Sequence, residues 1–396
     1  MRLQSIQCVQ YRRFDDVELN LGRRLTLLLG ANGSGKSSVL NGLAVGFGAV
    51  HQLLKVKSVN FKKTDFRVEG SAQSKWVHVK LTDANGLVWG RTERDSARSV
   101  VPKDLPKLAA LKSHLTPFLE DDFAQDLPLL VHYGVKRMVL DMPQRRRNSA
   151  ELGDRFTAMD NALTAGSSYR PMARWFDLRD TQELRAKRER DEAVEFNDLR
   201  AVRAAVSEVL PEVERVFISS LSPKLMVAYK NQILALEQLS DGYQTLLALV
   251  MDLAYRLSVA NPHRSNPLEA EAVVLIDEVD LHLHPAWQGR VVEDLLRAFP
   301  NVQFVLTTHS PVVVESINNH LQRHRIEGMP LPEELDSLFS LDPAVLAVYQ
   351  LNDGKVERAV DPETGLLDNA LLDRYDTLNR DFSAMLDLQY GDHAAS

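Results

Sequence analysis

The feature that most constrains the fold is a glycine-rich loop at residues 30–37, with the sequence Gly-Ala-Asn-Gly-Ser-Gly-Lys-Ser. Residues 24–29 (Arg-Leu-Thr-Leu-Leu-Leu) predict a short buried strand before it, and residues 37–54 predict a helix after it. A G-x-x-x-x-G-K-[ST] loop between a strand and a helix binds phosphates, because its backbone N–H groups point at a polyphosphate. The chain is therefore predicted to bind a nucleoside triphosphate.

Each position of this loop has an expected role. Lys36 is expected to reach the β- and γ-phosphates of ATP, and the Ser37 hydroxyl is expected to bind Mg²⁺. The N-terminus of the following helix adds positive potential at the same place. The remaining loop residues expected to contact ATP are Gly30, Asn32, Gly33, Gly35 and Ser38.

Composition is that of an ordinary globular protein, with 44% hydrophobic and 26% charged residues among 396. The net charge is −7, so any surface that binds nucleic acid must be local. The single cysteine, Cys8, excludes an internal disulfide. The chain has neither a signal-type N-terminus nor an apolar run of membrane length. We therefore expect a soluble, cytoplasmic protein with no membrane partner.

Strands and helices are expected to alternate along the second half of the chain. The expected order is strands at 224–229 and 232–237, a helix from Ser240 to about 257, a strand at 272–276, a helix at 286–298, a strand at 302–307 and a helix at 311–326. This alternation predicts an α/β fold with a mostly parallel sheet. A further core strand is expected at 129–133.

The first part of the chain is different, because its strands follow one another. Three strands are expected within residues 2–29, and 74–82 and 87–92 are expected to form a hairpin around an Asn-Gly turn. These strands predict an antiparallel N-terminal subdomain. Residues 93–128 are polar and contain four prolines, which argues against a regular element there.

Four regions follow from these patterns. They are an N-terminal lobe (1–140), a helical insertion (141–215), a C-terminal lobe (216–350) and a C-terminal tail (351–396). The insertion carries three consecutive arginines at 145–147, which could bind nucleic-acid phosphates or an acidic partner. A solvated surface is the simpler interpretation of this run.

A second part of the predicted site follows the strand at 272–276. This strand ends in two carboxylates, Asp277 and Glu278. A buried parallel strand delivers its terminal side chains to the ligand edge of the sheet, where the phosphate loop also lies. Asp277 is therefore expected to hold Mg²⁺, and Glu278 to orient or deprotonate the attacking water.

Two further stretches supply phosphate-facing groups. Residues 239–244 (Leu-Ser-Asp-Gly-Tyr-Gln) place Ser240 and Gly242 at a helix N-terminus, which is another position suited to an anion. Residues 307–311 (Thr-Thr-His-Ser-Pro) end the next strand and place His309 beside the phosphates. Either stretch alone is more typical of a capped helix or a core histidine.

Together and in this order, these elements resemble the ABC-type ATPases. The matching segments are 30–37 for Walker A, 239–244 for the signature, 276–278 for Walker B, Asp280 for the D-loop and His309 for the switch histidine. The resemblance implies that ATP is sandwiched head-to-tail in a dimer or higher oligomer. Ser240 and Gly242 of one subunit would then complete the γ-phosphate site of the other, while Lys36 and Glu278 act from the subunit that holds the nucleotide.

A narrower resemblance rests on residues 276–288 (Ile-Asp-Glu-Val-Asp-Leu-His-Leu-His-Pro-Ala-Trp-Gln) together with 299–304. These stretches are similar to the RecF/OLD-like AAA-type ATPases of bacteria, a group that includes the PtuA subunit of Septu-type anti-phage systems. Residues 11–14 (Tyr-Arg-Arg-Phe) resemble a segment of that group whose arginine lies near the nucleotide, which implies Arg12. No glutamine matches the Q-loop of ABC-type ATPases, and Asp65 is expected to replace it near the metal.

The resemblance implies an ATPase that gates a separate effector, such as a nuclease, in phage defence. A RecF-like DNA-repair ATPase that binds DNA directly is the first alternative, and the ATP-binding subunit of a transporter is the second. Residues 330–396 contain no Asp-x-Asp pair of the kind that the nuclease domain of OLD-type relatives needs. No built-in nuclease is therefore expected.

Overall fold

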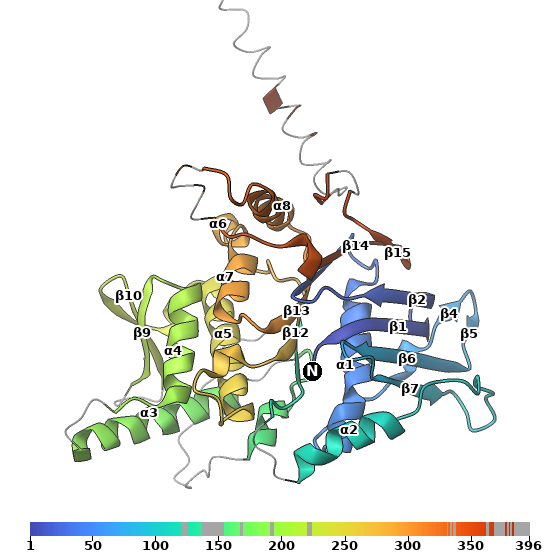
Figure 1. Ribbon diagram of the computed structural model, residues 1–396, viewed down its shortest axis with the longest axis horizontal. Coiled ribbons are helices and arrows are strands. Elements are labelled where there is room, and N and C mark those ends of the chain that lie inside the picture. Colours follow the sequence, from blue (N-terminus) through green and yellow to red (C-terminus); the bar gives the residue numbers. More distant parts are fainter. Residues whose placement is uncertain are drawn as a thin grey trace, which may run out of the picture.

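The fold is organised around a six-stranded sheet with the order β15-β14-β3-β13-β12-β8 in the computed structural model (Figure 1). Its strands are β3 (Leu25–Leu29), β8 (Leu129–Tyr133), β12 (Ala272–Ile276), β13 (Val302–Thr307), β14 (Leu346–Asn352) and β15 (Lys355–Arg358). All neighbouring pairs are parallel except β14 and β15. Every residue of β3, β8, β12 and β13 is buried, as in a parallel sheet covered on both faces. The predicted α/β class is confirmed.

The structure describes most of the chain, with gaps. The described residues are 1–120, 125–136, 154–166, 169–190, 194–219, 224–330, 332, 335, 338–361, 364–367, 377, 380, 382 and 383. The three arginines at 145–147 and most of the predicted tail (351–396) lie outside them. None of the described helices has the length and apolar character needed to cross a membrane.

A second, antiparallel sheet has the order β2-β1-β6-β7. Its strands are β1 (Leu3–Tyr11), β2 (Phe14–Asn20), β6 (Trp76–Asp83) and β7 (Val88–Arg94). The predicted hairpin is present, and the Asp83 carboxylate fixes its turn by accepting the N–H groups of Asn85 (2.9 Å) and Leu87 (2.8 Å). Two short strands, β4 (Val68–Glu69) and β5 (Ala72–Gln73), follow the 3-10 helix η1 (Lys63–Asp65).

Helix α1 (Lys36–Leu53) contacts both sheets, which places the phosphate loop at their junction. A glycine allows the close approach to β6, because a Cβ atom at Gly46 would lie 2.8 Å from Leu81 Cδ1. Figure 1 shows α1 beside β1 and β6.

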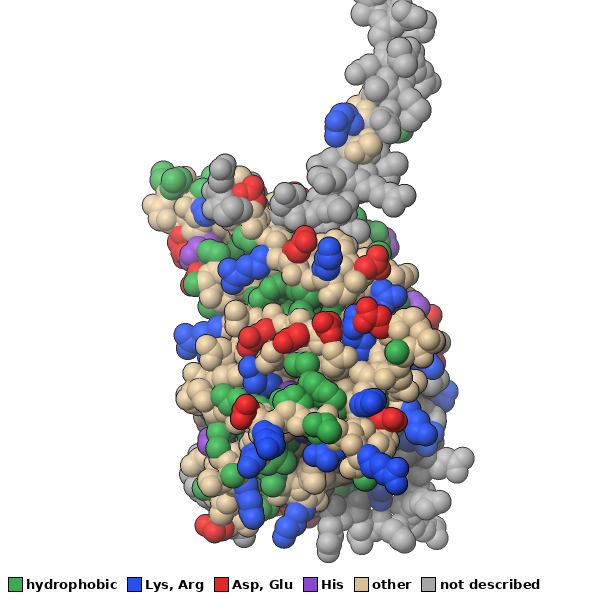
Figure 2. All heavy atoms as spheres, turned by 90° about the vertical axis from the view of Figure 1, so that its right-hand side faces the viewer, with side chains coloured by type: hydrophobic (Ala, Val, Ile, Leu, Met, Phe, Trp, Pro, Cys, Tyr) green, Lys and Arg blue, Asp and Glu red, His purple; other side chains and the backbone are tan. Residues whose placement is uncertain are grey.

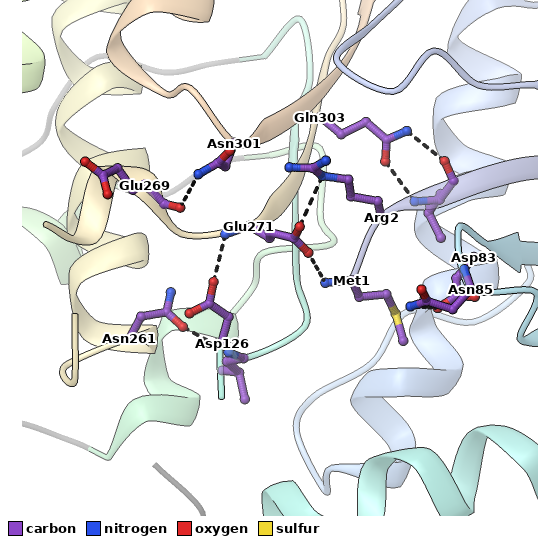
Figure 3. Close-up of polar contacts among 12 residues, drawn as sticks. Met1, Arg2, Asp83, Asn85, Asp126, Asn261, Glu269, Glu271, Asn301 and Gln303 are labelled. Atoms are coloured by element: carbon purple, nitrogen blue, oxygen red, sulfur yellow. Dashed lines mark hydrogen bonds and ion pairs between the residues drawn. The ribbon is translucent and has the colours of Figure 1, made fainter. Parts of the chain in front are cut away.

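The two sheets are also joined at the amino ends of the parallel strands (Figure 3). The buried Gln303 side chain accepts the Leu3 N–H at 2.8 Å and donates to the carbonyls of Leu3 and Gly22 at 2.7 and 2.8 Å. Glu271 pairs with the N-terminal amine at 3.1 Å and with Arg2 at 3.3 Å. These contacts fix the start of β1 against β12 and β13.

The described part of the insertion is helical, as predicted. It contains the 3-10 helix η2 (Arg155–Met159) and the helices α3 (Arg170–Arg190) and α4 (Asn197–Val209). Arg203 on α4 pairs with Glu183 on α3 at 2.9 Å. The predicted end of the insertion at 215 falls inside β9 (Val213–Ile218), which forms an antiparallel sheet with β10 (Leu225–Tyr229) and β11 (Gln232–Ala235).

The remaining helices confirm the predicted alternation with two differences. They are α5 (Asp241–Ala260), α6 (Pro285–Gln288), α7 (Val291–Ala298) and α8 (Pro311–Arg325). The helix expected at 286–298 is interrupted at Gly289 and Arg290, so it forms α6 and α7. The segment 93–128 contains an unpredicted helix, α2 (Ala109–Leu119), whose last turn includes Pro117.

Figure 2 shows the side of the molecule that carries the antiparallel sheet. Basic side chains gather in the lower part of this view, and acidic side chains form a band above them. The exposed basic residues from position 75 to the end of α2 are Lys75, Arg94, Arg98, Lys103, Lys107 and Lys112. Basic surface is therefore local, as the net charge of −7 requires.

Candidate nucleotide site

The phosphate loop connects the end of β3 to the start of α1, as predicted. Its three glycines have φ values of +141° (Gly30), +77° (Gly33) and +118° (Gly35), which other residues rarely adopt. A Cβ atom at Gly30 would lie 2.3 Å from the Leu351 carbonyl oxygen. Both the backbone conformation and the lack of space therefore require glycine in this loop.

A cavity of about 540 Å³ opens above the loop. Its lining residues are Arg12, Arg13, Asn32, Gly33, Gly35, Lys36, Ser37, Ser38, Thr64, Asp277, Glu278 and His309. The predicted Walker A, Walker B and switch residues thus meet at one site, although they lie far apart in the sequence.

Lys36 is the buried cation of this site. Its Nζ donates to the carbonyl oxygens of Gly30 at 2.8 Å and Ala31 at 3.0 Å, so the side chain folds back along the loop. Burial lowers the pKa of Lys36, and the nearby carboxylates of Asp277 and Glu278 oppose that shift. An anionic ligand in the cavity would compensate this buried positive charge.

The two Walker B carboxylates are held by Thr307 at the end of β13. The Thr307 hydroxyl donates to Asp277 Oδ1 at 2.7 Å and accepts the Glu278 N–H at 2.7 Å. The Asp277 N–H donates to the Tyr133 carbonyl at 2.8 Å. Glu278 has a φ of +51°, so the chain turns sharply directly after β12. This turn brings both carboxylates to the cavity, as predicted.

His309 lies in the same cavity, on the segment between β13 and α8. Burial is the main cause that lowers the pKa of His309, and the positive charge of Lys36 adds to it. Its imidazole is therefore neutral near pH 7. The neighbouring Thr308 hydroxyl donates to the Asp280 carboxylate, which links the predicted D-loop to this segment.

Arg12 reaches the cavity from the turn between β1 and β2. Its Nε donates to Asp65 Oδ1 at 2.9 Å, and its Nη1 lies 3.4 Å from the Ser38 hydroxyl. Asp65 itself is buried and is not among the residues that line the cavity. Its second oxygen accepts the Lys62 N–H at 2.8 Å. The position of Asp65 thus favours orienting Arg12 over the expected role as a metal ligand.

The signature residues Ser240 and Gly242 do not line this cavity. Gly242 packs on the D-loop, where a Cβ atom would lie 2.5 Å from the His282 carbonyl oxygen. Ser240 is exposed at the N-terminus of α5, and its hydroxyl makes no capping hydrogen bond. A single chain therefore does not bring the signature to its own phosphate loop.

Three residues of the site were not predicted. Arg13 and Thr64 line the cavity, and Thr307 holds the carboxylates. Arg13 follows Arg12 in the segment singled out from the sequence, and Thr307 belongs to the stretch that gave His309. The sequence offered a signal for both, and Thr64 directly precedes Asp65, which was expected near the metal.

A phosphate loop beside paired carboxylates at the carboxyl edge of a parallel sheet is the arrangement of the P-loop NTPase fold. A family model described as "AAA domain" matches residues 5–214, and the chain belongs to this AAA family. A second AAA domain model, whose description adds "Type IV TA system", matches residues 151–315.

Comparisons with curated proteins confirm the expected group. The chain is 26% identical to the Retron Vc95 probable ATPase of Vibrio cholerae serotype O1 biovar El Tor, over 86% of this chain and 75% of that protein. It is 26% identical to the Retron Ec83 probable ATPase of Escherichia coli, over 81% and 70%. The Septu protein PtuA of Bacillus mycoides (strain KBAB4) is 34% identical over 30% of this chain and 16% of that protein.

Among solved structures, an SmcHead bound to the C-winged helix domain of ScpA is similar. The alignment has a TM-score of 0.46 and 13% identity, and it covers 92% of this chain and 100% of that chain.

Proposed function

We propose that this chain hydrolyses ATP in the cavity above residues 30–37. The observation that carries the proposal is that Lys36, the carboxylates of Asp277 and Glu278, and His309 line one cavity. A polyphosphate would accept hydrogen bonds from the N–H groups of the loop. It would also accept hydrogen bonds from Lys36 in place of the two carbonyls that Lys36 now contacts.

Ser37 and Asp277 are the residues that would hold Mg²⁺. A hydroxyl and a carboxylate suit this ion because it prefers oxygen ligands, and both side chains line the cavity. When bound, Mg²⁺ would supply charge neutralisation at the phosphates. Thr307 keeps Asp277 oriented for this role through its hydrogen bond of 2.7 Å.

Glu278 is the proposed general base. Its backbone N–H is fixed by Thr307, so its side chain is held at the cavity beside the phosphate loop. His309 is neutral near pH 7 because its pKa is lowered, so one ring nitrogen can donate to a phosphate oxygen. Lys36 would stabilise the negative charge of the transferred group.

We further propose that two chains sandwich the nucleotide head-to-tail. Ser240 is exposed, its hydroxyl makes no capping bond, and neither Ser240 nor Gly242 lines the chain's own cavity. A helix N-terminus favours anions, so this end of α5 would complete the γ-phosphate site of a second subunit.

The proposed biological role is to gate a separate effector in cytoplasmic phage defence, with a nuclease as the expected class. This role is supported by the similarity to retron and Septu proteins. Within the described residues, no group of three or more His, Cys, Asp or Glu side chains could hold a metal ion as a nuclease requires. On the proposed role, cutting of DNA or RNA requires the partner, so the isolated chain is expected not to cut either with Mg²⁺ or Mn²⁺.

The test is Glu278→Gln. It should bind ATP normally but hydrolyse it about 10²-fold more slowly, which is the scale of lost general-base catalysis. Glu269→Gln, at an exposed residue before β12, is the matched control and should keep wild-type turnover. Near-wild-type turnover of Glu278→Gln would remove this residue from the mechanism.

A further inference from the structure

A chain of buried polar contacts starts at the strand end that carries Asp277. The Asp277 N–H donates to the Tyr133 carbonyl at 2.8 Å, and the Tyr133 phenol donates to Asp252 Oδ2 at 2.8 Å. Asp252 lies on α5, the helix whose N-terminus carries Ser240. Tyr133 therefore contacts the Walker B strand through its backbone and the signature helix through its side chain.

Arg256 extends this chain to the base of the insertion. Its Nε donates to Asp252 Oδ2 at 2.7 Å, and its Nη1 donates to the carbonyls of Ala158 at 2.6 Å and Asp160 at 3.1 Å. Although burial lowers the pKa of Arg256, the neighbouring groups, with the Asp252 carboxylate first among them, together raise it above its ordinary value. Arg256 is thus a permanent cation that holds the segment 154–166 to α5.

The segment 154–166 also lies along β8, on the edge that faces away from β12. The N–H of His132 donates to the Ala162 carbonyl at 2.7 Å, and the N–H of Gly134 donates to the Ala165 carbonyl at 3.0 Å. The contact is close, because a Cβ atom at Gly134 would lie 2.6 Å from the Ala165 oxygen. The base of the insertion is thereby attached both to the strand beside β12 and to the signature helix.

These charged and polar groups are buried, so they carry a desolvation penalty that an apolar core would not have. Tyr133, Asp252 and Arg256 are 0%, 1% and 5% exposed. Well-packed apolar residues can replace a buried ion pair without loss of stability, so stability alone does not explain one here. Networks of buried hydrogen bonds and ion pairs, together with the side chains packed on them, can carry energetic coupling between distant sites.

We propose that Tyr133, Asp252 and Arg256 are positioning residues that couple the ATP site to the insertion. The insertion is then the element through which an effector senses or controls ATP binding. The inference rests on the proposed function, because it assigns the regulation of that same site. A shift of the Walker B strand end would move Tyr133, and Tyr133 would pass the shift to α5 and to the segment 154–166.

The test compares Tyr133→Phe with Tyr349→Phe. Both variants lose one buried phenol hydroxyl on the same sheet. Among the described residues, the Tyr349 hydroxyl bonds the end of β2, through the Asn20 carbonyl (2.7 Å) and N–H (3.1 Å). ATP turnover is measured first. Tyr133→Phe should lower kcat roughly 3- to 10-fold, the range expected for one lost hydrogen bond, with KM for ATP changed less than about twofold. Tyr349→Phe should keep the wild-type kcat.

Hydrogen exchange of single amides gives a second readout that needs no hydrolysis. In Glu278→Gln, adding ATP and MgCl₂ should slow exchange at His132 and Gly134, the two amides bonded to the insertion. The double variant with Tyr133→Phe should lose this response, whereas the double variant with Tyr349→Phe should keep it.

The outcomes separate this inference from the proposed function. Absent hydrolysis by the wild-type chain would contradict the proposed function, while the exchange experiment would still test the coupling. An ATP response confined to the phosphate loop, or equal behaviour of the two tyrosine variants, would overturn the coupling.

Discussion

The hydroxyl of Thr307 lies 2.7 Å from Asp277 Oδ1 and donates a hydrogen bond to it. Thr307 is fully buried at the end of β13, so this bond fixes the carboxylate from the neighbouring strand. The Thr307 hydroxyl oxygen also accepts a hydrogen bond from the Glu278 N–H. One hydroxyl thus sets the positions of both acidic residues of the proposed site.

Thr307→Val should therefore damage stability and activity together. It keeps the shape but removes the hydrogen bonds that Thr307 makes with the Asp277 carboxylate and the Glu278 N–H, at a cost of about 1–3 kcal/mol. Urea unfolding and ATP turnover measure the two effects. Thr26→Val is the control, because Thr26 is equally buried and accepts the Gly22 N–H at 2.9 Å away from the cavity. It should lose stability but keep kcat, and equal kcat in both variants would contradict the role of Thr307.

Asp65→Asn should act through Arg12. A weaker Asp65–Arg12 contact should raise KM for ATP roughly 3- to 10-fold, with a small change in kcat, since one charge-assisted hydrogen bond is affected. The Mg²⁺ concentration needed for half-maximal activity should not change. Asp15→Asn is the control, because Asp15 is an exposed carboxylate on β2, the strand that follows Arg12. A selective shift in the Mg²⁺ requirement would restore Asp65 as a metal ligand.

Stability should decrease as the pH falls from about 6.5 towards 4. Burial lowers the pKa of His51, His78 and His132 to about 4 each, from an ordinary value of 6.5. In this window the unfolded chain binds protons that the folded chain does not, so the free energy of unfolding rises with pH. Asp294 opposes part of this effect, because burial raises its pKa to about 6.

A variant isolates one of these groups. His78→Gln should reduce the slope of unfolding free energy against pH by about 1.4 kcal/mol per unit, the value for one proton. Urea unfolding at several pH values between 4.5 and 7 measures the slope. His114→Gln, at an exposed histidine, is the control. An unchanged slope in His78→Gln would show that the pKa of His78 is the same in the folded and the unfolded chain, which would contradict the prediction.

Gln303→Leu should weaken the junction between the two sheets and lower the free energy of unfolding. Gln303 satisfies three buried backbone groups of Leu3 and Gly22, and leucine satisfies none. A loss of about 2–4 kcal/mol in the free energy of unfolding is expected. Glu271→Gln weakens the more exposed ion pairs at the same junction and should cost less than about 1 kcal/mol. Similar losses in both variants would contradict this assignment.

Much of the fold could be predicted because its central strands are short, apolar and followed by recognisable loops. β3, β12 and β13 are entirely buried, and each is followed by a motif whose residue types indicate a function in nucleotide binding. The hairpin of β6 and β7 was predictable because its Asn85-Gly86 turn needs the positive φ of +81° that Gly86 has.

Other elements depend on tertiary contacts that a sequence does not display. α2 forms despite Pro117, because Leu111, Leu115 and Phe118 bury one face of the helix. β14 follows a stretch with little periodic pattern, and its partner β3 lies more than 300 residues earlier. The pairing of Asp65 with Arg12 likewise joins positions 53 residues apart.

The most direct test of the account mixes two inactive variants, Lys36→Ala and Ser240→Arg. Each alone should hydrolyse almost no ATP, although Ser240→Arg should still bind it. In a mixed dimer one site carries both changes, while the other joins an intact phosphate loop to an intact signature. Mixing should recover up to roughly a quarter of the wild-type rate, because about half of the dimers are mixed and one of their two sites is intact. No recovery, or full turnover of Ser240→Arg as a dilute monomer, would contradict a composite site.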